Sequence, residues 1–386
     1  MKKHLNNLIE RTQDILAGEQ LEFLHKFSDF PIQMGCVDSP FEEDIFCDME
    51  WFISPNNGLI QLKNLIPLNI LYEEGHNSGQ VGGLWIKHHQ QFAEFIRKYK
   101  CKNIFEIGGA HGLLSKYYRK DCSYNNWTIL EPNPCPAPDI KANFIKDFFN
   151  DNFWHESLND SDCVVHSHVL EHIYQPERFL RKISKLSGKK YMFFSVPNMK
   201  AMLKNKYTNC LNFEHTLLLT ESVIESLLRK YNFELIDKKY FRDDHSIFYA
   251  CQRQNYDIQC NSHPQNEYIQ NKALFMDYVN HYENDINSIT VTIQNESENS
   301  NCYLFGAHIF SQHLLSTGLS SSLFKGILDN DVTKQGKRLY GTKLKVFNPN
   351  ILKNDDTAIV VLRAGVYSEE ISADIKKHIN SNVRFI

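Results

Sequence analysis

A carboxylate followed by spaced glycines is the first feature of the sequence that could do chemistry. It lies in FEIGGAHG (residues 105–112), where a short apolar run predicts a strand that ends near Glu106 and turns into a helix. A dinucleotide fingerprint, Gly-x-Gly-x-x-Gly, would place its first glycine where Glu106 stands, and an acid there would repel a pyrophosphate. The spacing therefore favours a cationic ligand without phosphate, which the backbone at Gly108, Gly109 and Gly112 can approach closely.

A second acid follows at the end of the next predicted strand. Glu131 lies in LEPN (residues 130–133), 25 residues after Glu106. At an offset of ~20 residues, a strand-end acid in nucleotide-binding folds receives ribose hydroxyls, and one carboxylate can accept hydrogen bonds from two of them. S-adenosylmethionine carries a ribose, a sulfonium and an ammonium group. The two acids therefore predict this compound as the cofactor.

A segment rich in histidine, VHSHVLEHIYQPERFL (residues 165–180), follows a third predicted strand. Imidazole and carboxylate groups are common zinc ligands, so His166, His168 and His172 with Glu171 would suit a metal site. The pattern places His168 in the loop at the strand end and not on a helix face shared with His172. We therefore expect no metal in this segment.

These motifs need elements that bring several strand ends together. Short apolar runs alternate with helical stretches over residues 86–253, which predicts a doubly wound, mostly parallel α/β sheet of Rossmann type. Residues 1–85 predict a helical lead-in over 1–30, from the spacing of its apolar residues, and then a β-rich substrate module. Residues 254–300 predict a linker with one helix, and residues 301–386 a smaller α/β domain. Several domains suit a chain of 386 residues, which is too long for one core.

Composition limits the partners of the chain. With 42 Lys and Arg against 46 Asp and Glu, the net charge of −4 gives no broad cationic surface for nucleic-acid phosphates. No stretch reaches the ~18 consecutive apolar residues of a membrane helix, and the N-terminus lacks the apolar region of a secretory signal. We therefore expect a cytoplasmic protein that binds neither nucleic acid nor membranes, with its ten cysteines as free thiols.

In this order, the motifs resemble those of the class I S-adenosylmethionine-dependent methyltransferases. The segment from Glu106 to Gly112 is similar to their first motif, Glu131 to the ribose-binding acid, and residues 168–172 to the segment that closes the cofactor pocket. The strand end SVPN (residues 195–198) matches the position that follows. The residues that this resemblance implies for binding S-adenosyl-L-methionine are Glu106, Gly108, Gly109, Gly112, Glu131, Pro132, Asp147 and Phe148 beside the adenine, His168 and Leu170.

A second resemblance covers nearly the whole chain. A β-rich N-terminal module, a methyltransferase core, the segment NFEHT (residues 212–216) and a C-terminal α/β unit follow one another as in the bacterial C-methyltransferases that act on nucleotide-linked ketosugars. The stretches FGA (305–307) and LDND (328–331) resemble the final domain of that family. The resemblance implies that His215 is the catalytic base, with Glu214 beside it, and an imidazole can take up a proton near neutral pH.

Two departures from that family change the predicted reaction. The zinc-binding cysteine pairs of its N-terminal module are missing, since only Cys36 and Cys47 lie in this module and two thiolates do not complete a tetrahedral site. The tyrosines that would stabilise an enolate are replaced where the chain reads YEEGHNS (residues 72–78). We therefore expect loss of zinc, and O-methylation of a hydroxyl on a nucleotide-activated hexose or heptose with His215 or His76 as the base.

Three alternatives stay open at this point. One is C-methylation of a nucleotide-linked ketosugar, and another is a non-catalytic protein that binds a sugar nucleotide. The third, a nicotinamide-dependent dehydrogenase built on Gly306, is disfavoured because FGAHI (residues 305–309) lacks a full glycine fingerprint. We expect the sugar nucleotide, a precursor of a bacterial surface polysaccharide such as capsule, to lie at a domain interface. The N-terminal segment offers a surface for a homodimer.

Overall fold

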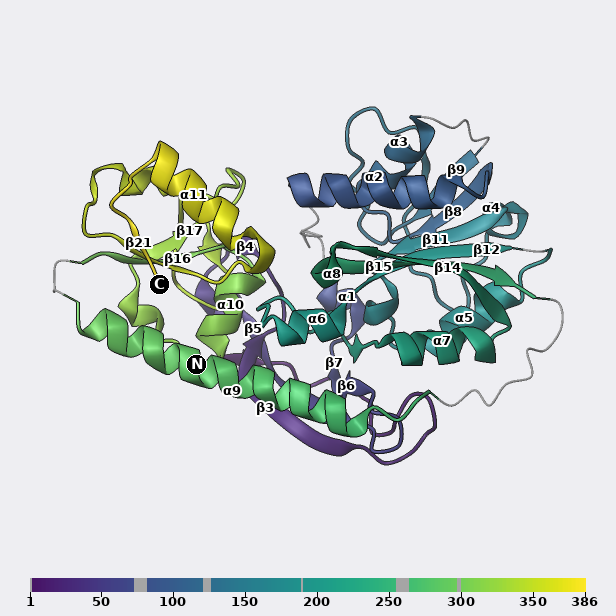
Figure 1. The fold of residues 1–386 in the computed structure, drawn as a ribbon, viewed down its shortest axis with the longest axis horizontal. Coiled ribbons are helices and arrows are strands. Elements are labelled where there is room, and N and C mark those ends of the chain that lie inside the picture. Colours follow the sequence, from purple (N-terminus) through teal and green to yellow (C-terminus); the bar gives the residue numbers. More distant parts are fainter. Residues whose placement is uncertain (1, 73–81, 121–125, 189, 255–263, 297–299) are drawn as a thin grey trace.

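The protein, seen in a computed structural model, has two lobes joined along one side by a long helix (Figure 1). One lobe, at the right of Figure 1, is built on a seven-stranded sheet, and the other, at the left, on a five-stranded parallel sheet. A third sheet, formed mainly by the N-terminal segment, lies beside the long helix and between the lobes. The structure describes the chain except for residues 1, 73–81, 121–125, 189, 255–263 and 297–299.

The seven-stranded sheet is doubly wound, as predicted. Its order is β10-β9-β8-β11-β12-β15-β14, in which neighbours from β10 to β12 are parallel and β15 is antiparallel to both of its neighbours. The chain reverses its direction of winding between β8 and β11, and ligands of such sheets bind outside the carboxyl ends of strands at this point. The strands are β8 (Asn103–Ile107), β9 (Asn126–Leu130), β10 (Asn143–Ile145), β11 (Cys163–Ser167), β12 (Tyr191–Pro197), β14 (Phe233–Phe241) and β15 (Ser246–Arg253).

Helices cover both faces of this sheet. Successive residues of a strand point to opposite faces, so Ile104 belongs to the core under α2 and α3, while Phe105 belongs to the core under α5 and α7. Both cores are made of buried aliphatic and aromatic side chains, and their burial holds the helices against the two faces of the sheet. The helices of this lobe are α2 (Gly83–Arg97), α3 (Leu113–Arg119), α4 (Glu156–Asp160), α5 (Pro176–Ser184), α6 (Met199–Lys204), α7 (Glu221–Lys230) and α8 (Arg242–His245).

The described residues 2–31 of the N-terminal segment form strands, turns and loops, so the predicted helix over residues 1–30 is wrong. Leu24, Phe27 and Phe30 are buried at intervals of three, which looks like a helical spacing in the sequence. They lie on one strand, β3 (Glu22–Pro31), whose pairing with β5 shifts register twice. Each shift inserts an extra residue and interrupts the two-residue alternation of a strand. The other N-terminal elements are β1 (Lys3–His4), β2 (Ile9–Glu10), β4 (Cys36–Val37), β5 (Ile45–Ile53), β6 (Ile60–Leu62), β7 (Asn64–Leu65) and α1 (Leu68–Leu71).

The N-terminal sheet is completed by a strand that comes much later in the chain. Its order is β1-β5-β6-β13, with β3 paired to β5, and β13 (Leu217–Leu218) follows β12, the last parallel strand of the seven-stranded sheet, in sequence. Leu217 pairs with Gln61 and Leu218 with Ile60. The segment just before β13, which contains His215, is therefore held against the N-terminal module.

The C-terminal lobe also joins the N-terminal module. Its parallel sheet has the order β19-β17-β16-β20-β21, and β18 (Arg338–Leu339) pairs outside this sheet with β4. Arg338 donates two hydrogen bonds to the fully buried Asp44, at 2.6 and 2.7 Å. The remaining elements are α9 (Tyr268–Gln294), β16 (Cys302–Phe305), α10 (Ile309–Ser316), β17 (Gly326–Leu328), β19 (Val346–Phe347), β20 (Ile359–Leu362), α11 (Ser368–His378) and β21 (Arg384–Phe385).

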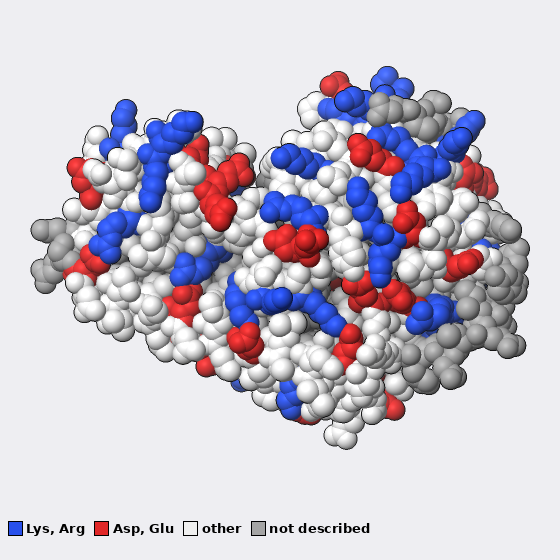
Figure 2. Space-filling model, in the orientation of Figure 1, with Lys and Arg blue, Asp and Glu red and all other residues white. Residues whose placement is uncertain are grey.

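The surface charge and the character of the helices can be compared with what binding to nucleic acids or membranes requires. Figure 2 shows basic and acidic side chains interspersed on the visible face of the molecule. Among the helices of the described residues, none combines the length and the apolar character needed to cross a bilayer.

Candidate active site

The glycine turn after β8 is packed too closely for other side chains. Gly108 has φ +77° and Gly112, which caps α3, has φ +70°, a backbone region that favours glycine. A Cβ atom at Gly108 would lie 2.5 Å from Cγ2 of Val169, and one at Gly109 would lie 2.7 Å from Cδ of Glu106. The three glycines thus allow the turn to lie against both the acid and the loop after β11.

Glu106 is a buried carboxylate at the carboxyl end of β8. Its side chain is only 3% exposed, and Oε2 accepts a hydrogen bond of 2.7 Å from the indole nitrogen of Trp127. Burial raises the pKa of Glu106 to about 7, the hydrogen bond from Trp127 lowers it, and the charge of Glu131 raises it further. A cationic ligand beside this carboxylate would favour its charged form.

Glu131 connects the ends of β8 and β9. Its Oε2 accepts a hydrogen bond from the backbone of Ala110 at 3.2 Å, and its Oε1 accepts one from the backbone of Asn133 at 3.0 Å. The carboxylate therefore lies against the glycine turn, and its predicted role in binding ribose hydroxyls stays a prediction. Pro132, which lies between Glu131 and Asn133 in the chain, is partly exposed.

A pocket opens at the glycine turn, at the point where the sheet reverses its winding. The residues that line it are His89, Glu106, Gly108, Gly109, Ala110, His111, Leu113, Leu114 and Ser167. His89 could not be predicted from the sequence, because α2 lies before the motifs and its histidines show no spacing of their own. Its Nδ1 is held 2.7 Å from the carbonyl of Trp85, one helical turn earlier.

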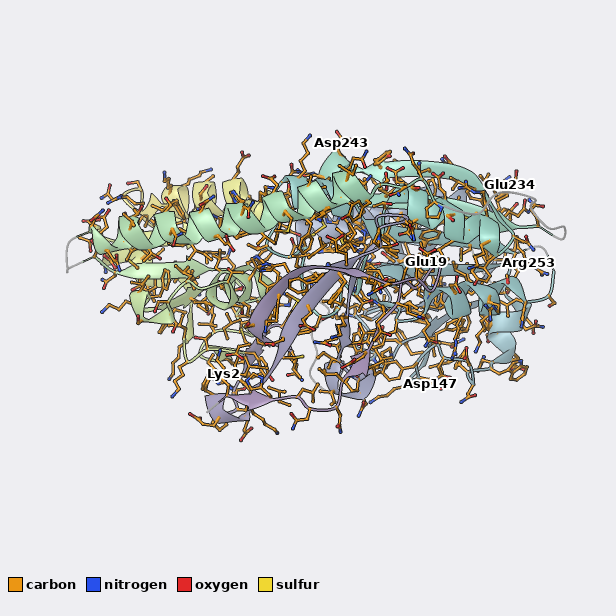
Figure 3. The ribbon with its side chains drawn as sticks, turned by 90° about the horizontal axis from the view of Figure 1, so that it is seen from below. Lys2, Glu19, Asp147, Glu234, Asp243 and Arg253 are labelled. Carbon is orange, nitrogen blue, oxygen red and sulfur yellow. The ribbon has the colours of Figure 1, made fainter. Side chains whose placement is uncertain are left out.

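Several other predicted cofactor residues do not line this pocket. Asp147 is exposed, and Figure 3 places it at the outer edge of the lobe. The ring of the half-buried Phe148 lies 6.3 Å from the ring of Tyr72. Leu170 is 1% exposed and belongs to the core under α5 and α7, so it supports the loop after β11 from within.

His168 begins the loop that leads away from the pocket. Its φ of +54° is unusual for a residue with a side chain, and its backbone nitrogen donates to Ser195 O at 2.9 Å. Nε2 lies 2.9 Å from the hydroxyl of Ser246, while Nδ1 lies 3.5 Å from Oε1 of Glu171. The loop therefore directs one ring nitrogen of His168 to the sheet edge and the other to Glu171.

His215 is held in a defined orientation by its own loop. Its Nδ1 lies 2.7 Å from the carbonyl oxygen of Cys210, so Nδ1 carries the proton and Nε2 has the free electron pair. The amide oxygen of Asn212 accepts hydrogen bonds from the backbone of Glu214 and of His215, at 2.8 and 3.0 Å. Burial lowers the pKa of His215, and the hydrogen bond to Cys210 and the charge of Glu214 oppose this. The imidazole is thus neutral with Nε2 as its basic atom.

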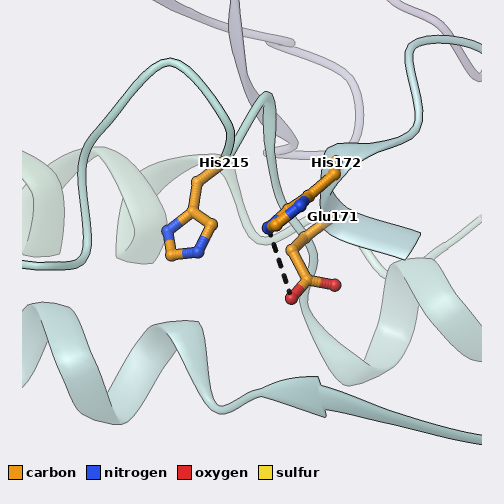
Figure 4. Close-up of side chains that lie close together, drawn as sticks. All are labelled: Glu171, His172 and His215. Carbon is orange, nitrogen blue, oxygen red and sulfur yellow. Dashed lines mark ion pairs between the residues drawn. The ribbon is translucent and has the colours of Figure 1, made fainter. Parts of the chain in front are cut away.

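Glu171, His172 and His215 lie together in the described structure, although 43 residues separate the two histidines (Figure 4). One ligand atom from each side chain lies within 4.8 Å of the others, and Nε2 of His172 is 3.9 Å from Oε1 of Glu171. Burial raises the pKa of Glu171 to about 8, and the charge of Glu214 adds to this rise. In the sequence His172 groups with His166 and His168, and nothing in the pattern connects it with His215.

Two further groups adjoin this cluster. Tyr72 OH lies 3.3 Å from Nδ1 of His172, and the backbone carbonyl of Tyr72 accepts a hydrogen bond from the side chain of Asn133 at 2.8 Å. Oε2 of Glu214, which is 8% exposed, lies 3.7 Å from the same Nδ1. Tyr72 therefore links the end of β9 to the histidine cluster. His76, the other predicted base, lies outside the described residues.

Arg11 from the N-terminal segment fixes the segments that carry the cluster. Its guanidinium donates to the backbone carbonyls of Leu62 at 3.3 Å, Thr216 at 3.0 Å and Tyr174 at 2.8 Å. The side chain is buried, and burial lowers its pKa to about 10. No motif marked Arg11 in the sequence, because its partners are main-chain atoms that only the fold brings together.

Comparison with known families gives two matches. A family described as "Methyltransferase domain" matches residues 79–238, and one described as "C-methyltransferase C-terminal domain" matches residues 264–386. The chain thus contains a class I S-adenosylmethionine-dependent methyltransferase domain with its Rossmann-like sheet, followed by a C-terminal domain found with C-methyltransferases. S-adenosylmethionine is the cofactor of this protein.

Solved structures with a similar fold are methyltransferases of low identity. The methyltransferase domain of bacterial CtHen1 matches with a TM-score of 0.35 and 12% identity, over 44% of this chain and 99% of its own. The plantazolicin methyltransferase BpumL, solved with SAH, has a TM-score of 0.33 and 13% identity over 44% and 84% of the two chains. Magnesium protoporphyrin IX methyltransferase from Synechocystis PCC 6803, solved with SAM, has a TM-score of 0.31 and 13% identity over 47% and 89%. No curated protein matches the chain.

Proposed function

We propose that the protein transfers a methyl group from S-adenosylmethionine to a nucleotide-activated sugar. The observation that carries this proposal is the continuity of residues 167–172: Ser167 lines the cofactor pocket, and Glu171 and His172 lie beside His215. A methyl donor in the pocket and an acceptor at the cluster would therefore adjoin the same short segment. Methyl transfer needs the two reacting atoms held about 3–3.5 Å apart, which such a shared segment can achieve.

The residues around the pocket suit the proposed cofactor. The cofactor supplies an electrophilic methyl group on a positively charged sulfur. Glu106, as a buried carboxylate at the pocket wall, would stabilise its positive charge, and Glu131 would receive the ribose hydroxyls. The close packing at Gly108 and Gly109 would exclude water from the ligand.

On the acceptor side, we propose that His215 is the general base that takes the proton from the group to be methylated. Its Nε2 is unprotonated and its ring is fixed through Nδ1, which are the properties of a general base that contributes ~10²–10⁴ in rate. Glu214, next to it, would stabilise the imidazolium that forms.

Two observations support one kind of acceptor over the other. The C-terminal match is to a domain of C-methyltransferases, and Tyr72 keeps a phenol OH beside the cluster, where it could stabilise the oxygen of an enolate. The sequence argument for a hydroxyl acceptor depended on the absence of such a tyrosine. We therefore favour, as the atom that accepts the methyl group, a carbon next to a carbonyl group of a ketosugar. A sugar hydroxyl that His215 deprotonates is the second candidate.

The test is an assay with isotopically labelled S-adenosylmethionine and a panel of nucleotide sugars, which includes ketosugars and their reduced forms. We expect transfer to a nucleotide-linked ketosugar and, by NMR of the product, a methyl group bonded to a ring carbon. A methoxy signal would support the second candidate. Absence of transfer to every nucleotide sugar, in protein that binds S-adenosylhomocysteine, would refute the sugar assignment.

A further inference from the structure

We propose that Glu171, His172 and His215 bind a first-row divalent transition-metal ion. Their three ligand atoms lie within 4.8 Å of one another, so small rotations of the side chains would bring them to bonding distance from one ion. Two imidazoles and one carboxylate are a common ligand set for zinc, manganese, cobalt and iron. The side chains point toward one another in the close-up view (Figure 4).

The carboxylate of Glu171 is the strongest observation in favour of a cation site. The residue is 0% exposed, and neither oxygen has a hydrogen-bond partner. Buried polar groups of proteins are nearly always satisfied, and an unpaired carboxylate in the interior is costly. Two ring nitrogens face Oε1, Nδ1 of His168 at 3.5 Å and Nε2 of His172 at 3.9 Å. A cation shared with these nitrogens would satisfy the carboxylate.

The histidines are oriented as metal ligands usually are. In metal sites, the ring nitrogen that faces away from the ion is generally held by an oxygen atom. The Nδ1 atoms of His215 and His172 face the carbonyl of Cys210 and the hydroxyl of Tyr72, at 2.7 and 3.3 Å. His168 follows the same rule, since Nε2 meets Ser246 and Nδ1 faces Glu171, and it could act as a fourth ligand.

An ion at this place would take part in the transfer that we propose. Three protein ligands leave a coordination position open, and an oxygen of the acceptor could occupy it and become polarised. Nε2 of His215 cannot bind an ion and a proton together, so in the loaded protein the ion would polarise the acceptor oxygen and the proton of the acceptor would pass to the carboxylate of Glu214, whose Oε2 lies 3.7 Å from Nδ1 of His172. This catalytic role rests on the proposed function, whereas binding of the ion does not.

The direct test is titration of the full-length protein, freed of metal with a chelator, with Mn²⁺, Co²⁺ and Mg²⁺ by calorimetry. We expect one Mn²⁺ or Co²⁺ per chain and weaker binding of Mg²⁺, which prefers oxygen ligands. The visible spectrum of the cobalt form should lack the thiolate charge-transfer band that binding to cysteines would give. A cobalt–thiolate spectrum, or no stoichiometric binding of any of these ions, would overturn the proposal.

Variants locate the site. Glu171→Gln and His172→Ala should each weaken Mn²⁺ binding at least about tenfold, because loss of even an outer partner of a metal ligand costs about 10–100-fold in affinity. The matched control is His378→Ala, which removes an exposed histidine paired with Asp374 on α11 and should change nothing. Unchanged affinity for S-adenosylhomocysteine shows that each variant is folded. Wild-type metal affinity in both Glu171→Gln and His172→Ala would refute the assignment.

The outcome separates this inference from the proposed function. Methyl transfer to a sugar that persists in excess chelator, with no ion bound, would leave the function standing and remove the metal. Stoichiometric binding of Mn²⁺ that both variants abolish, without transfer to any sugar, would keep the metal site and remove the sugar.

Discussion

The glycine turn and the histidine cluster stand at the two ends of residues 167–172, and they are assembled differently. The turn is local, since Glu106, Gly108, Gly109 and Gly112 belong to one strand–turn–helix unit. The cluster draws on segments far apart in the chain: Tyr72 just after α1, the loop after β11, and His215 from the loop before β13. A local site depends on backbone conformation, whereas a composite site depends on how whole segments are fastened together.

The largest expected effect tests whether a change in the histidine cluster can lower catalysis without lowering cofactor affinity. His215→Gln removes the basic nitrogen but keeps a polar side chain of similar length, so kcat for methyl transfer should fall by about 10²–10⁴-fold. The dissociation constant of S-adenosylhomocysteine should stay within about twofold, since His215 does not line the pocket. Steady-state kinetics and calorimetry measure the two quantities. A comparable loss of cofactor affinity would mean that the two sites are one.

The next effect concerns the fastening of the cluster. Arg11→Met removes hydrogen bonds to three backbone carbonyls, of which that of Thr216 keeps a second donor in the backbone nitrogen of Leu62. We expect the free energy of unfolding to fall by about 3 kcal/mol, because an unsatisfied buried acceptor costs about 1–3 kcal/mol and removal of the buried charge returns part of this loss. Urea unfolding measures it. The control is Arg178→Met, which breaks an exposed ion pair with Asp151 and should cost below about 1 kcal/mol. Equal costs for the two variants would contradict the role given to Arg11.

A smaller effect is expected at the local site. Glu106→Gln keeps the shape of the side chain and removes its charge, so affinity for S-adenosylmethionine should fall by about 10–100-fold, the value of a charge-assisted contact of about 1.5–3 kcal/mol. The Mn²⁺ affinity of the cluster should be unaffected. Calorimetry on the same protein measures both ligands. An unchanged affinity for the cofactor would remove Glu106 from the site.

The smallest effect is a dependence on pH. Since burial raises the pKa of Glu106 to about 7, its carboxyl group becomes protonated as the pH falls below that value and loses its attraction for a cation. Affinity for S-adenosylmethionine should be constant at higher pH and fall toward tenfold per pH unit below about pH 7. Glu106→Gln should show a flat profile over this range. A wild-type profile as flat as that of the variant would contradict the assignment.

The same contrast explains what the sequence could predict. The alternation of strands and helices predicted the doubly wound sheet, and the Glu-x-Gly-x-x-x-Gly spacing predicted the turn, because both depend on neighbours in the chain. Arg11 and the contact of His172 with His215 depend on contacts across 40 to 200 residues, which no spacing encodes. The two register shifts of β3 gave its buried residues the spacing of a helix. The spacing of buried residues distinguishes a strand from a helix only where the strand pairs without register shifts.

The exchange of strands between the modules limits how this protein can be re-engineered. β13 lies in the sheet of the N-terminal module but is encoded after the parallel core strands, and β18 of the C-terminal lobe pairs with β4. A hybrid enzyme made by grafting residues 2–72 from a relative would keep a foreign partner at each of these pairings. Chimeras that alter acceptor choice should therefore exchange the segments around β13 and β18 together with the N-terminal module, so that all paired strands come from the same parent protein.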